Sequence, residues 1–361
     1  METIRELSPG SALREATDAG LVVRREHPLN CEAPLGALGN GAAMATEQFY
    51  RRNHFPIPNL DAATYRLSVN GLVERTLALS TAELSAMPSR TLVATLECAG
   101  NGRTWFVPAI EGERWDLGAV STGQWSGVPL RDVLERAGVK SGAREVVFRG
   151  ADGGVVAGAP TPIRFERSLP LEVARSADVL LVHTMNGAPL TPAHGFPLRL
   201  VVPGWYAVAA VKWLTEIEVI DHALEAHYQT EKYWYEWQRG ASWVREPVTR
   251  MRVRSLITSP EADAEVRRGE IAVRGVAWSG EAPIARVEVS AGGGPWQEAR
   301  LLGAQDPYGC ALWEARVRLN ESGVLRARAT DGAGHTQPEL AEWNKLGYGN
   351  NSIHQVQVRL V

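Results

Sequence analysis

The C-terminal third of the chain constrains the fold most strongly, because apolar and polar residues alternate there in short runs separated by turns. Gly, Pro and Asp residues lie between these runs. Alternation with period two is typical of strands with one buried face, and a series of such strands without helical periodicity is typical of an antiparallel sandwich. We therefore predict a β-sandwich after about Arg250. The runs are residues 252–258, 270–277, 284–290, 312–319 and 323–329.

Mixed helices and strands are predicted before that point. Ser80 followed by Glu83 is a capping pattern that begins a helix, and Gly138 is expected to end a second helix over residues 129–137. Asn70-Gly71 is typical of a hairpin turn. The first 53 residues look irregular, so we expect them to wrap the surface of this domain. Strands are predicted at residues 65–69, 91–96, 145–149, 179–184, 198–202 and 210–219.

Length and charge narrow the class of protein. A chain of 361 residues is too long for one ordinary core, so two domains are expected. A formal net charge of -3 and a pI near 6.3 do not favour a nucleic-acid partner. The start of the chain carries charges throughout and no segment is apolar enough to span a membrane, so we expect no membrane association. The expected compartment is the cytoplasm, or the periplasm if a leader was removed.

One cysteine lies where an apolar strand meets a tight turn. Cys98 follows residues 91–96 closely, and Gly100-Asn101-Gly102 tolerates the positive φ angles that a sharp turn needs. Arg103 adds a positive charge, which favours thiolate over thiol and attracts an anion. These features indicate a thiolate metal ligand. The alternative is a buried structural thiol, which is the usual role of a free cysteine.

Two loops combine prolines or glycines with cationic side chains. Arg52 and His54 precede a Phe-Pro-Ile-Pro run that would hold the backbone extended, and His194 and Arg199 flank the start of an apolar strand that leads to Lys212. Such groups bind anions by charge-assisted hydrogen bonds, so Arg199, His194 and Lys212 are candidates for holding a phosphate. Taken alone, a solvated surface turn and an ordinary Pro/Gly loop remain the alternatives.

The segment between the two predicted domains is aromatic over residues 228–237. Tyrosine and tryptophan dominate buried contacts, so most of this segment is expected to pack at an interface. A tyrosine hydroxyl that faces a site would instead donate or accept a proton.

Taken in order, four blocks of the sequence resemble the molybdenum-dependent sulfite oxidase family, which also includes assimilatory nitrate reductases and bacterial sulfite dehydrogenases. The blocks are residues 25–30, 52–58 and 96–103, and the run 185–214. The resemblance implies an α+β fold, with a mixed α+β molybdopterin domain over residues 1–248 and an immunoglobulin-like antiparallel β-sandwich over residues 249–361. It also implies a homodimer formed through the second domain.

The resemblance implies roles for particular residues. Cys98 would be the thiolate bound to molybdenum, beside the dithiolene sulfurs of molybdopterin, since soft sulfur ligands suit this metal. Arg52 and Arg103 would hold an oxyanion substrate, Trp115 would wall the pocket, and Tyr233 would help to move a proton or an electron. The pterin and its phosphate would lie against Phe49, Tyr50, Arg52, His54, Asp152, His194, Arg199 and Lys212.

The implied activity is oxygen-atom transfer to sulfite, which gives sulfate and is followed by two one-electron steps. A cytochrome-b5-like haem domain would need its own sequence ahead of the molybdenum domain, so we expect no haem in this chain. The expected electron acceptor is then an external protein such as a c-type cytochrome.

One position departs from the family pattern. Sulfite oxidases carry a further pocket arginine in a Trp-Asn-x-Arg-Gly motif, whereas Leu346 takes that place in residues 343–347. Lys345 lacks the planar fork of an arginine and would be an incomplete substitute. Sulfite is still the expected substrate. The alternatives are a nitrate-reductase-like or other oxyanion enzyme of the family and, in another class, a non-catalytic molybdopterin or anion binding protein.

Overall fold

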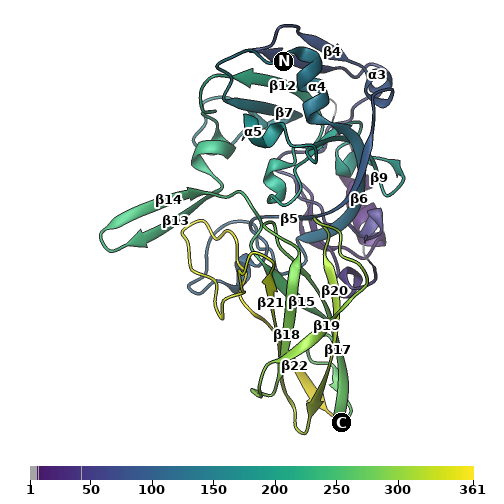
Figure 1. The fold of residues 1–361 in the computed structure, drawn as a ribbon, viewed down its shortest axis with the longest axis vertical. Coiled ribbons are helices and arrows are strands. Elements are labelled where there is room, and N and C mark those ends of the chain that lie inside the picture. Colours follow the sequence, from purple (N-terminus) through teal and green to yellow (C-terminus); the bar gives the residue numbers. More distant parts are fainter. Residues whose placement is uncertain (1–5, 7, 42) are drawn as a thin grey trace.

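The computed structural model describes residues 6, 8–41 and 43–361, which form a mixed domain and a β-sandwich (Figure 1). In this view the mixed domain lies at the top and the sandwich at the bottom, and a two-stranded hairpin projects from the region between them. Within the described part of the chain, no helix is long and apolar enough to cross a membrane. The predicted order of a mixed domain and then a mainly antiparallel sandwich is confirmed.

A five-stranded sheet forms one half of the first domain, in the order β4-β3-β12-β7-β8, with β12 parallel to β3. Two predictions are wrong here. Asn70 and Gly71 do not form a hairpin turn, because both pair with β12 at the end of β3. The strand predicted from residue 210 begins at Leu214, because Trp213 turns the chain with a φ of 49°. The strands are β3 (Leu67–Gly71), β4 (Leu77–Leu79), β7 (Glu145–Gly154), β8 (Ile163–Pro170) and β12 (Leu214–Ile220).

The second sheet of this domain is antiparallel, in the order β10-β9-β6-β5, and β11 also pairs with β9. Its strands are β5 (Arg90–Glu97), β6 (Val120–Pro129), β9 (Leu180–Met185), β10 (Ala188–Pro189) and β11 (Arg199–Val201). The predicted strand before Cys98 is therefore confirmed as β5. Both predicted helices are also confirmed, because α3 (Thr81–Ser85) begins with a complete capping box at Ser80 and α4 (Leu130–Ala137) ends at Gly138, whose φ is 72°. A further short helix is α5 (Leu171–Ala174).

The N-terminal segment is more regular than predicted. Helix α1 begins with a proline in its first turn and buries Ala12 and Ala16, and β2 continues the packing because Cys31 exchanges backbone hydrogen bonds with Arg51. Two small apolar residues give little hydrophobic periodicity, which explains why the sequence did not indicate this helix. Residues 1–5, 7 and 42 lie outside the described residues. The elements are α1 (Pro9–Asp18), β1 (Val22–Arg25), β2 (Asn30–Glu32), α2 (Leu35–Leu38) and the 3-10 turn η1 (Thr46–Gln48).

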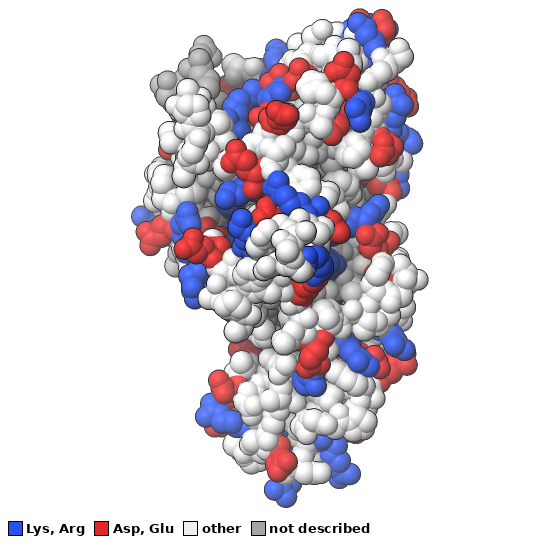
Figure 2. Space-filling view, turned by 90° about the vertical axis from the view of Figure 1, so that its left-hand side faces the viewer, with Lys and Arg blue, Asp and Glu red and all other residues white. Residues whose placement is uncertain are grey.

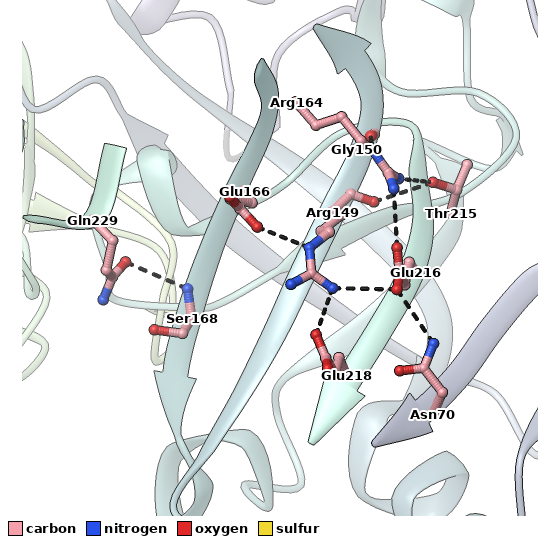
Figure 3. Close-up of polar contacts among 10 residues, drawn as sticks. All are labelled: Asn70, Arg149, Gly150, Arg164, Glu166, Ser168, Thr215, Glu216, Glu218 and Gln229. Atoms are coloured by element: carbon pink, nitrogen blue, oxygen red, sulfur yellow. Dashed lines mark hydrogen bonds and ion pairs between the residues drawn. The ribbon is translucent and has the colours of Figure 1, made fainter. Parts of the chain in front are cut away.

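An ion-pair network ties three strands of the five-stranded sheet together (Figure 3). Arg149 of β7 donates to Glu166 of β8 at 2.8 Å, and to Glu216 and Glu218 of β12 at 3.2 and 2.7 Å. These side chains are 21–31 % exposed, so each pair contributes about 1 kcal/mol or less to stability. The network holds β7 in place just before the point where its register with β8 shifts.

The second domain is a sandwich whose two sheets share β19, in the overall order β15-β17-β20-β19-β18-β21-β22-β16. Buried residues alternate along β20 and β21, and Trp313 and Val287 lie in the core between the sheets. The five predicted strands are confirmed, and β16, β19 and β22 are additional. The strands are β15 (Arg254–Ser259), β16 (Glu265–Val266), β17 (Gly269–Trp278), β18 (Ile284–Ala291), β19 (Gln297–Leu302), β20 (Ala311–Leu319), β21 (Gly323–Asp331) and β22 (His354–Leu360).

The aromatic segment forms the hairpin that projects in Figure 1, made of β13 (Trp234–Arg239) and β14 (Ser242–Pro247). A π-helical turn, η5 (His227–Glu231), precedes it. The predicted packing holds for Tyr235 and Trp237, which are buried and stacked with ring centroids 5.2 Å apart. Trp243 on the second strand is instead 53 % exposed.

A buried ion pair joins the two domains. Arg254, at the start of β15, donates to Glu97, the last residue of β5, at 3.0 Å, and both side chains are 2 % exposed. The carboxylate of Glu97 also accepts hydrogen bonds from Trp278 at 2.9 Å and Asn101 at 3.0 Å. Removing one partner of such a pair leaves an uncompensated buried charge, which is far more costly than losing an exposed pair.

Replacing Arg254 with methionine should lower the free energy of unfolding by about 3–5 kcal/mol, because the Glu97 carboxylate would stay buried without its counter-charge. Chemical denaturation of the purified protein measures this loss. Arg274→Met is the matched control, since Arg274 is 63 % exposed in its pair with Glu314, and its cost should stay below about 1 kcal/mol. Adding Glu97→Gln to Arg254→Met should recover part of the loss. Equal effects of the two arginine variants would contradict this role.

Candidate functional site

Two adjoining cavities meet at Cys98. The first has a volume of about 60 Å³ and the second about 300 Å³, and both are lined by Cys98, Arg52, His54 and Tyr233. The predicted site residues all line one or both of these cavities. The first cavity collects Phe49, Tyr50, Asp152, His194, Arg199 and Lys212, and the second collects Arg103 and Trp115.

The position of Cys98 follows from the end of β5 and the turn after it. Cys98 donates its backbone N–H to Ala119 at 2.9 Å, and its carbonyl accepts from the N–H of Asn101 at 2.9 Å. Gly102 completes the turn with a φ of 79°, and a Cβ atom there would lie 2.7 Å from Nη2 of Arg254. A larger residue would therefore clash with the Arg254 guanidinium and would be strained at this positive φ.

The free thiol of Cys98 is not activated in the way the sequence suggested. Burial raises its pKa, although Arg52, the N–H of Gly100 and Arg103 each act in the opposite direction. Desolvation of the thiolate exceeds the attraction of these charges. Arg103 therefore acts on the thiol in the direction expected from the sequence, but the effect of burial on the pKa of Cys98 is larger.

Buried positive charge dominates the first cavity. Arg199 is fully buried and donates to the carbonyls of His194 at 3.1 Å and Ala210 at 3.3 Å. Burial, together with repulsion from Arg199, holds the pKa of Lys212 well below its usual value, against the attraction of Asp152. Burial raises the pKa of Asp152 to about 7, against the attraction of Lys212. A bound anion would remove the repulsion that these cations experience.

Neutral groups complete the first cavity. His194 donates from Nε2 to the carbonyl of Thr46 at 3.1 Å, and its burial, with repulsion from nearby cations, holds its pKa well below the usual value. The imidazole is therefore uncharged, and its Nδ1 is an acceptor. Phe49 packs edge-on against this ring with centroids 5.5 Å apart, and Tyr50 stacks on Phe49.

The second cavity is lined by three arginines, Arg25, Arg52 and Arg103, and by Trp115. Arg103 donates to the carbonyls of Glu113 at 2.9 Å and Leu346 at 3.3 Å, so its orientation is fixed by two loops. Arg52 donates to the carbonyl of Asn53. Trp115 is completely buried, and its indole N–H has no partner among the described residues. The cavity thus presents fixed donors that suit an oxyanion.

A hydrogen-bonded pair lies between the two cavities. The hydroxyl of Tyr233 and Nε2 of His54 are 2.6 Å apart. Burial raises the pKa of Tyr233 and, with repulsion from Arg52, lowers the pKa of His54 well below its usual value, so both groups are neutral near pH 7. Tyr233 has a φ of 63°, which is a strained conformation for a residue other than glycine and is typical of functional sites.

Leu346 also lines the second cavity, as expected from its place in the sequence. Lys345 cannot substitute for a pocket arginine, because its ammonium group lies 3.4 Å from Glu236 and over the ring of Trp243, and its side chain is 59 % exposed. The idea that Lys345 compensates for the missing arginine is therefore wrong.

The residues around Cys98 fit a molybdenum-bearing pterin. Among the described residues, Oδ1 of Asp152 and Nε of Arg199 are buried without a hydrogen-bond partner, and both residues line the first cavity. Crowded cations, orphaned polar atoms and a neutral histidine match an anionic, hydrogen-bonding cofactor. The part of the chain described by the structure contains no cluster of three His, Cys, Asp or Glu residues able to hold a metal.

Sequence reasoning gave no separate role to three residues of the site. Asn53 accepts a hydrogen bond from Lys212, Trp213 lies under the same ammonium group at 4.2 Å, and Tyr348 stacks on Tyr233 with centroids 4.9 Å apart. Asn53 and Trp213 each stand next to a predicted residue, so their polarity or aromatic character was the available signal. Tyr348 lies 115 positions from its partner, and only the fold reveals this contact.

Comparison with protein families identifies two modules in the chain. Residues 54–228 match the oxidoreductase molybdopterin binding domain, and residues 245–361 match the Mo-co oxidoreductase dimerisation domain. The first match contains the cysteine and most of the first cavity. The second contains Leu346 and Tyr348.

Individual proteins agree with these matches. Sulfite oxidase of Gallus gallus is 37 % identical over 93 % of this chain and 77 % of its own length. Sulfite oxidase of Arabidopsis thaliana is 34 % identical over 94 % of this chain and 94 % of its own length. The crystal structure of the sulfane dehydrogenase SoxCD from Paracoccus pantotrophus matches with a TM-score of 0.81 and 31 % identity, over 92 % of this chain and 85 % of that one. The chain therefore belongs to the sulfite oxidase family and is a molybdopterin-dependent oxidoreductase.

Proposed function

We propose that this enzyme oxidises sulfite, or a close analogue of sulfite, to the corresponding higher oxyanion. The observation that carries the proposal is the position of Cys98, where a cavity rich in buried cations meets a pocket that contains Arg52 and Arg103. The names of the sulfite oxidases and of the sulfane dehydrogenase SoxCD also share oxidation of a sulfur compound.

For sulfite, the overall reaction is SO₃²⁻ + H₂O → SO₄²⁻ + 2 H⁺ + 2 e⁻. A bound molybdopterin supplies oxygen-atom transfer coupled to a two-electron change at the metal. Cys98 would ligate the metal, while Asp152, His194, Arg199 and Lys212 would hold the pterin and its phosphate.

The residues of the second cavity would bind and orient the substrate. Arg52 and Arg103 would raise the local concentration of the oxyanion and align it, and the two carbonyls that accept from Arg103 reduce the reorganisation this requires. Trp115 would exclude water from one side. Tyr233 and His54 are both neutral, and one proton lies in the hydrogen bond between the Tyr233 hydroxyl and Nε2 of His54. At neutral pH the pair would hold this proton near the reacting oxygen.

An external one-electron carrier, such as a c-type cytochrome, would accept the electrons one at a time. Exposed apolar side chains lie on segments that also line or adjoin the second cavity: Val107, Trp243, Leu340 and Trp343. Trp343 donates to the carbonyl of Pro108 at 3.1 Å and Lys345 lies over Trp243, so these segments form one rim. We call these four residues the rim patch. Such patches mark interaction surfaces.

Figure 2 looks onto the side of the molecule from which the hairpin projects, where positive and negative side chains alternate without a dominant sign. A mixed surface of this kind does not favour nucleic acid as the partner on this face.

The match to a dimerisation domain supports a homodimer. The cytoplasm remains the proposed compartment, with the periplasm as the alternative if a leader was removed.

Replacing Lys212 with methionine should reduce the molybdopterin that remains with the purified protein at least tenfold, because a charge-assisted hydrogen bond to the phosphate would be lost. Fluorescence of the released, oxidised pterin and the molybdenum content measure this. Lys140→Met is the control, because Lys140 is exposed and does not line either cavity. A full complement of cofactor in Lys212→Met would exclude this role.

Sulfite added without oxygen to the oxidised, metal-loaded protein should bleach the thiolate-to-molybdenum absorption band at one equivalent per site. Cys98→Ser should abolish both the band and turnover, because no thiolate would reach the metal. Cys310→Ser should retain both, since Cys310 lies outside the two site cavities. A band that survives in Cys98→Ser would disprove the ligand assignment, and a band that sulfite leaves unchanged would disprove the substrate class.

Replacing Trp243 with glutamate should raise the KM for a protein electron acceptor about tenfold or more while leaving the rate with ferricyanide unchanged, because exposed tryptophans contribute strongly to protein interfaces. Steady-state kinetics with the two acceptors measures this difference. Val361→Glu changes an apolar residue that is 71 % exposed at the end of the sandwich farthest from the mixed domain and should alter neither rate (Figure 1). Equal KM values in the two variants would remove the rim patch from the docking surface.

A further inference from the structure

One wall of the second cavity is apolar and rigid. Leu346 is half-buried there and sits at the tip of a turn in which Asn344 accepts from the N–H of Tyr348 at 3.0 Å and donates to its carbonyl at 2.8 Å. The carbonyl of Leu346 accepts from Arg103. The backbone that carries Leu346 is therefore held by hydrogen bonds on both sides.

The lysine next to Leu346 supplies no charge at this wall, and the lysine that does line the cavity is Lys232, an exposed residue of another segment. Lys345 points toward Glu236 and Trp243, outside the cavity. Arg25 and His227 line the cavity, but each is paired with a carboxylate, of Glu113 at 3.0 Å and of Glu231 at 2.8 Å. A negatively charged oxygen placed against Leu346 would contact an aliphatic side chain, which donates no hydrogen bond.

The shape of the substrate determines which compounds this apolar wall would favour. Sulfur(IV) in sulfite carries three substituents and one lone pair, and the lone pair has to face the Cys98 end of the cavity, where the proposed reaction delivers oxygen. Arg52 and Arg103 can each bind one oxygen substituent. A third substituent that lies against Leu346 would be favoured as carbon and penalised as an unpartnered oxygen.

The cavity also has room for a carbon substituent. Its volume of about 300 Å³ lies at the lower end of the range for pockets that bind organic ligands, about 300–1,000 Å³, and exceeds the need of a four-atom oxyanion. Part of this space would be taken by the metal, so a short substituent fits best.

We propose that the preferred substrate class is an organic sulfinate, R–SO₂⁻ with a short alkyl group R against Leu346. This inference rests on the proposed function and specifies its substrate. The reaction is R–SO₂⁻ + H₂O → R–SO₃⁻ + 2 H⁺ + 2 e⁻, in which one S–O bond forms at the sulfur lone pair, the R–S bond stays intact, and two electrons pass to a one-electron acceptor. The sulfur is oxidised and the acceptor is reduced.

The kinetic test compares sulfite, methanesulfinate, ethanesulfinate and propanesulfinate with the holoenzyme and ferricyanide as acceptor. The kcat/KM for methanesulfinate should exceed that for sulfite about tenfold, since one unpaired oxygen is avoided. Each further methylene should raise it about fourfold until the space is filled. Leu346→Arg should reverse the preference between sulfite and methanesulfinate, whereas Leu346→Met, which keeps an apolar wall of similar volume, should preserve it.

Binding of the products gives a readout that does not depend on turnover. Isothermal titration calorimetry of the holoenzyme should show affinity that rises from methanesulfonate to propanesulfonate, and Leu346→Arg should abolish this dependence and bind sulfate more tightly than the wild type. Preference for sulfite, with product affinity independent of chain length and unchanged in Leu346→Arg, would overturn the inference while leaving sulfite oxidation intact. Failure of sulfite and all the sulfinates to reduce the enzyme would instead refute the proposed function.

Discussion

The ion pair between Glu97 and Arg254 is the constraint on which the site depends. Glu97 immediately precedes Cys98, and its carboxylate is satisfied by an arginine and a tryptophan from the sandwich and by Asn101 from the turn. Because buried charges require close partners, the sandwich cannot shift without disturbing the strand end that carries the thiol. The second domain therefore does more than support dimerisation, since it fixes the geometry of the cysteine.

The first cavity differs from this ion pair, because its buried charges are mainly positive. Arg199 and Lys212 are both buried: burial lowers the pKa of Arg199 to about 10, and burial together with repulsion from Arg199 lowers the pKa of Lys212. Charge that is unfavourable in the protein alone becomes favourable when an anion binds. Cofactor binding should therefore stabilise the folded protein by mass action, and the protein gives up intrinsic stability in order to bind its cofactor tightly.

The sequence predicted those parts of the fold whose signals are local. The alternating strands, the capping box at Ser80 and the glycine that ends α4 depend on neighbours within a few residues. Helix α1 and the true start of β12 were missed, because small buried alanines and a left-handed tryptophan leave little pattern. The Glu97–Arg254 pair spans 157 positions, and no local pattern could indicate it. Family resemblance supplied the site residues. The orientation of Lys345 and the direction in which the pKa of the Cys98 thiol shifts could be seen only in the structure.

The two cavities are lined by different parts of the chain. The residues that line the first cavity all precede residue 248, whereas the second cavity adds Leu346 and Tyr348 from the C-terminal segment. A substitution at Leu346 would thus change the lining of the second cavity without altering a residue that lines the first. The Arg103 guanidinium connects the two parts, because it lines the substrate cavity and donates to the carbonyl of Leu346. The lining of the second cavity can therefore change at the C-terminal turn while the residues of the first cavity stay fixed.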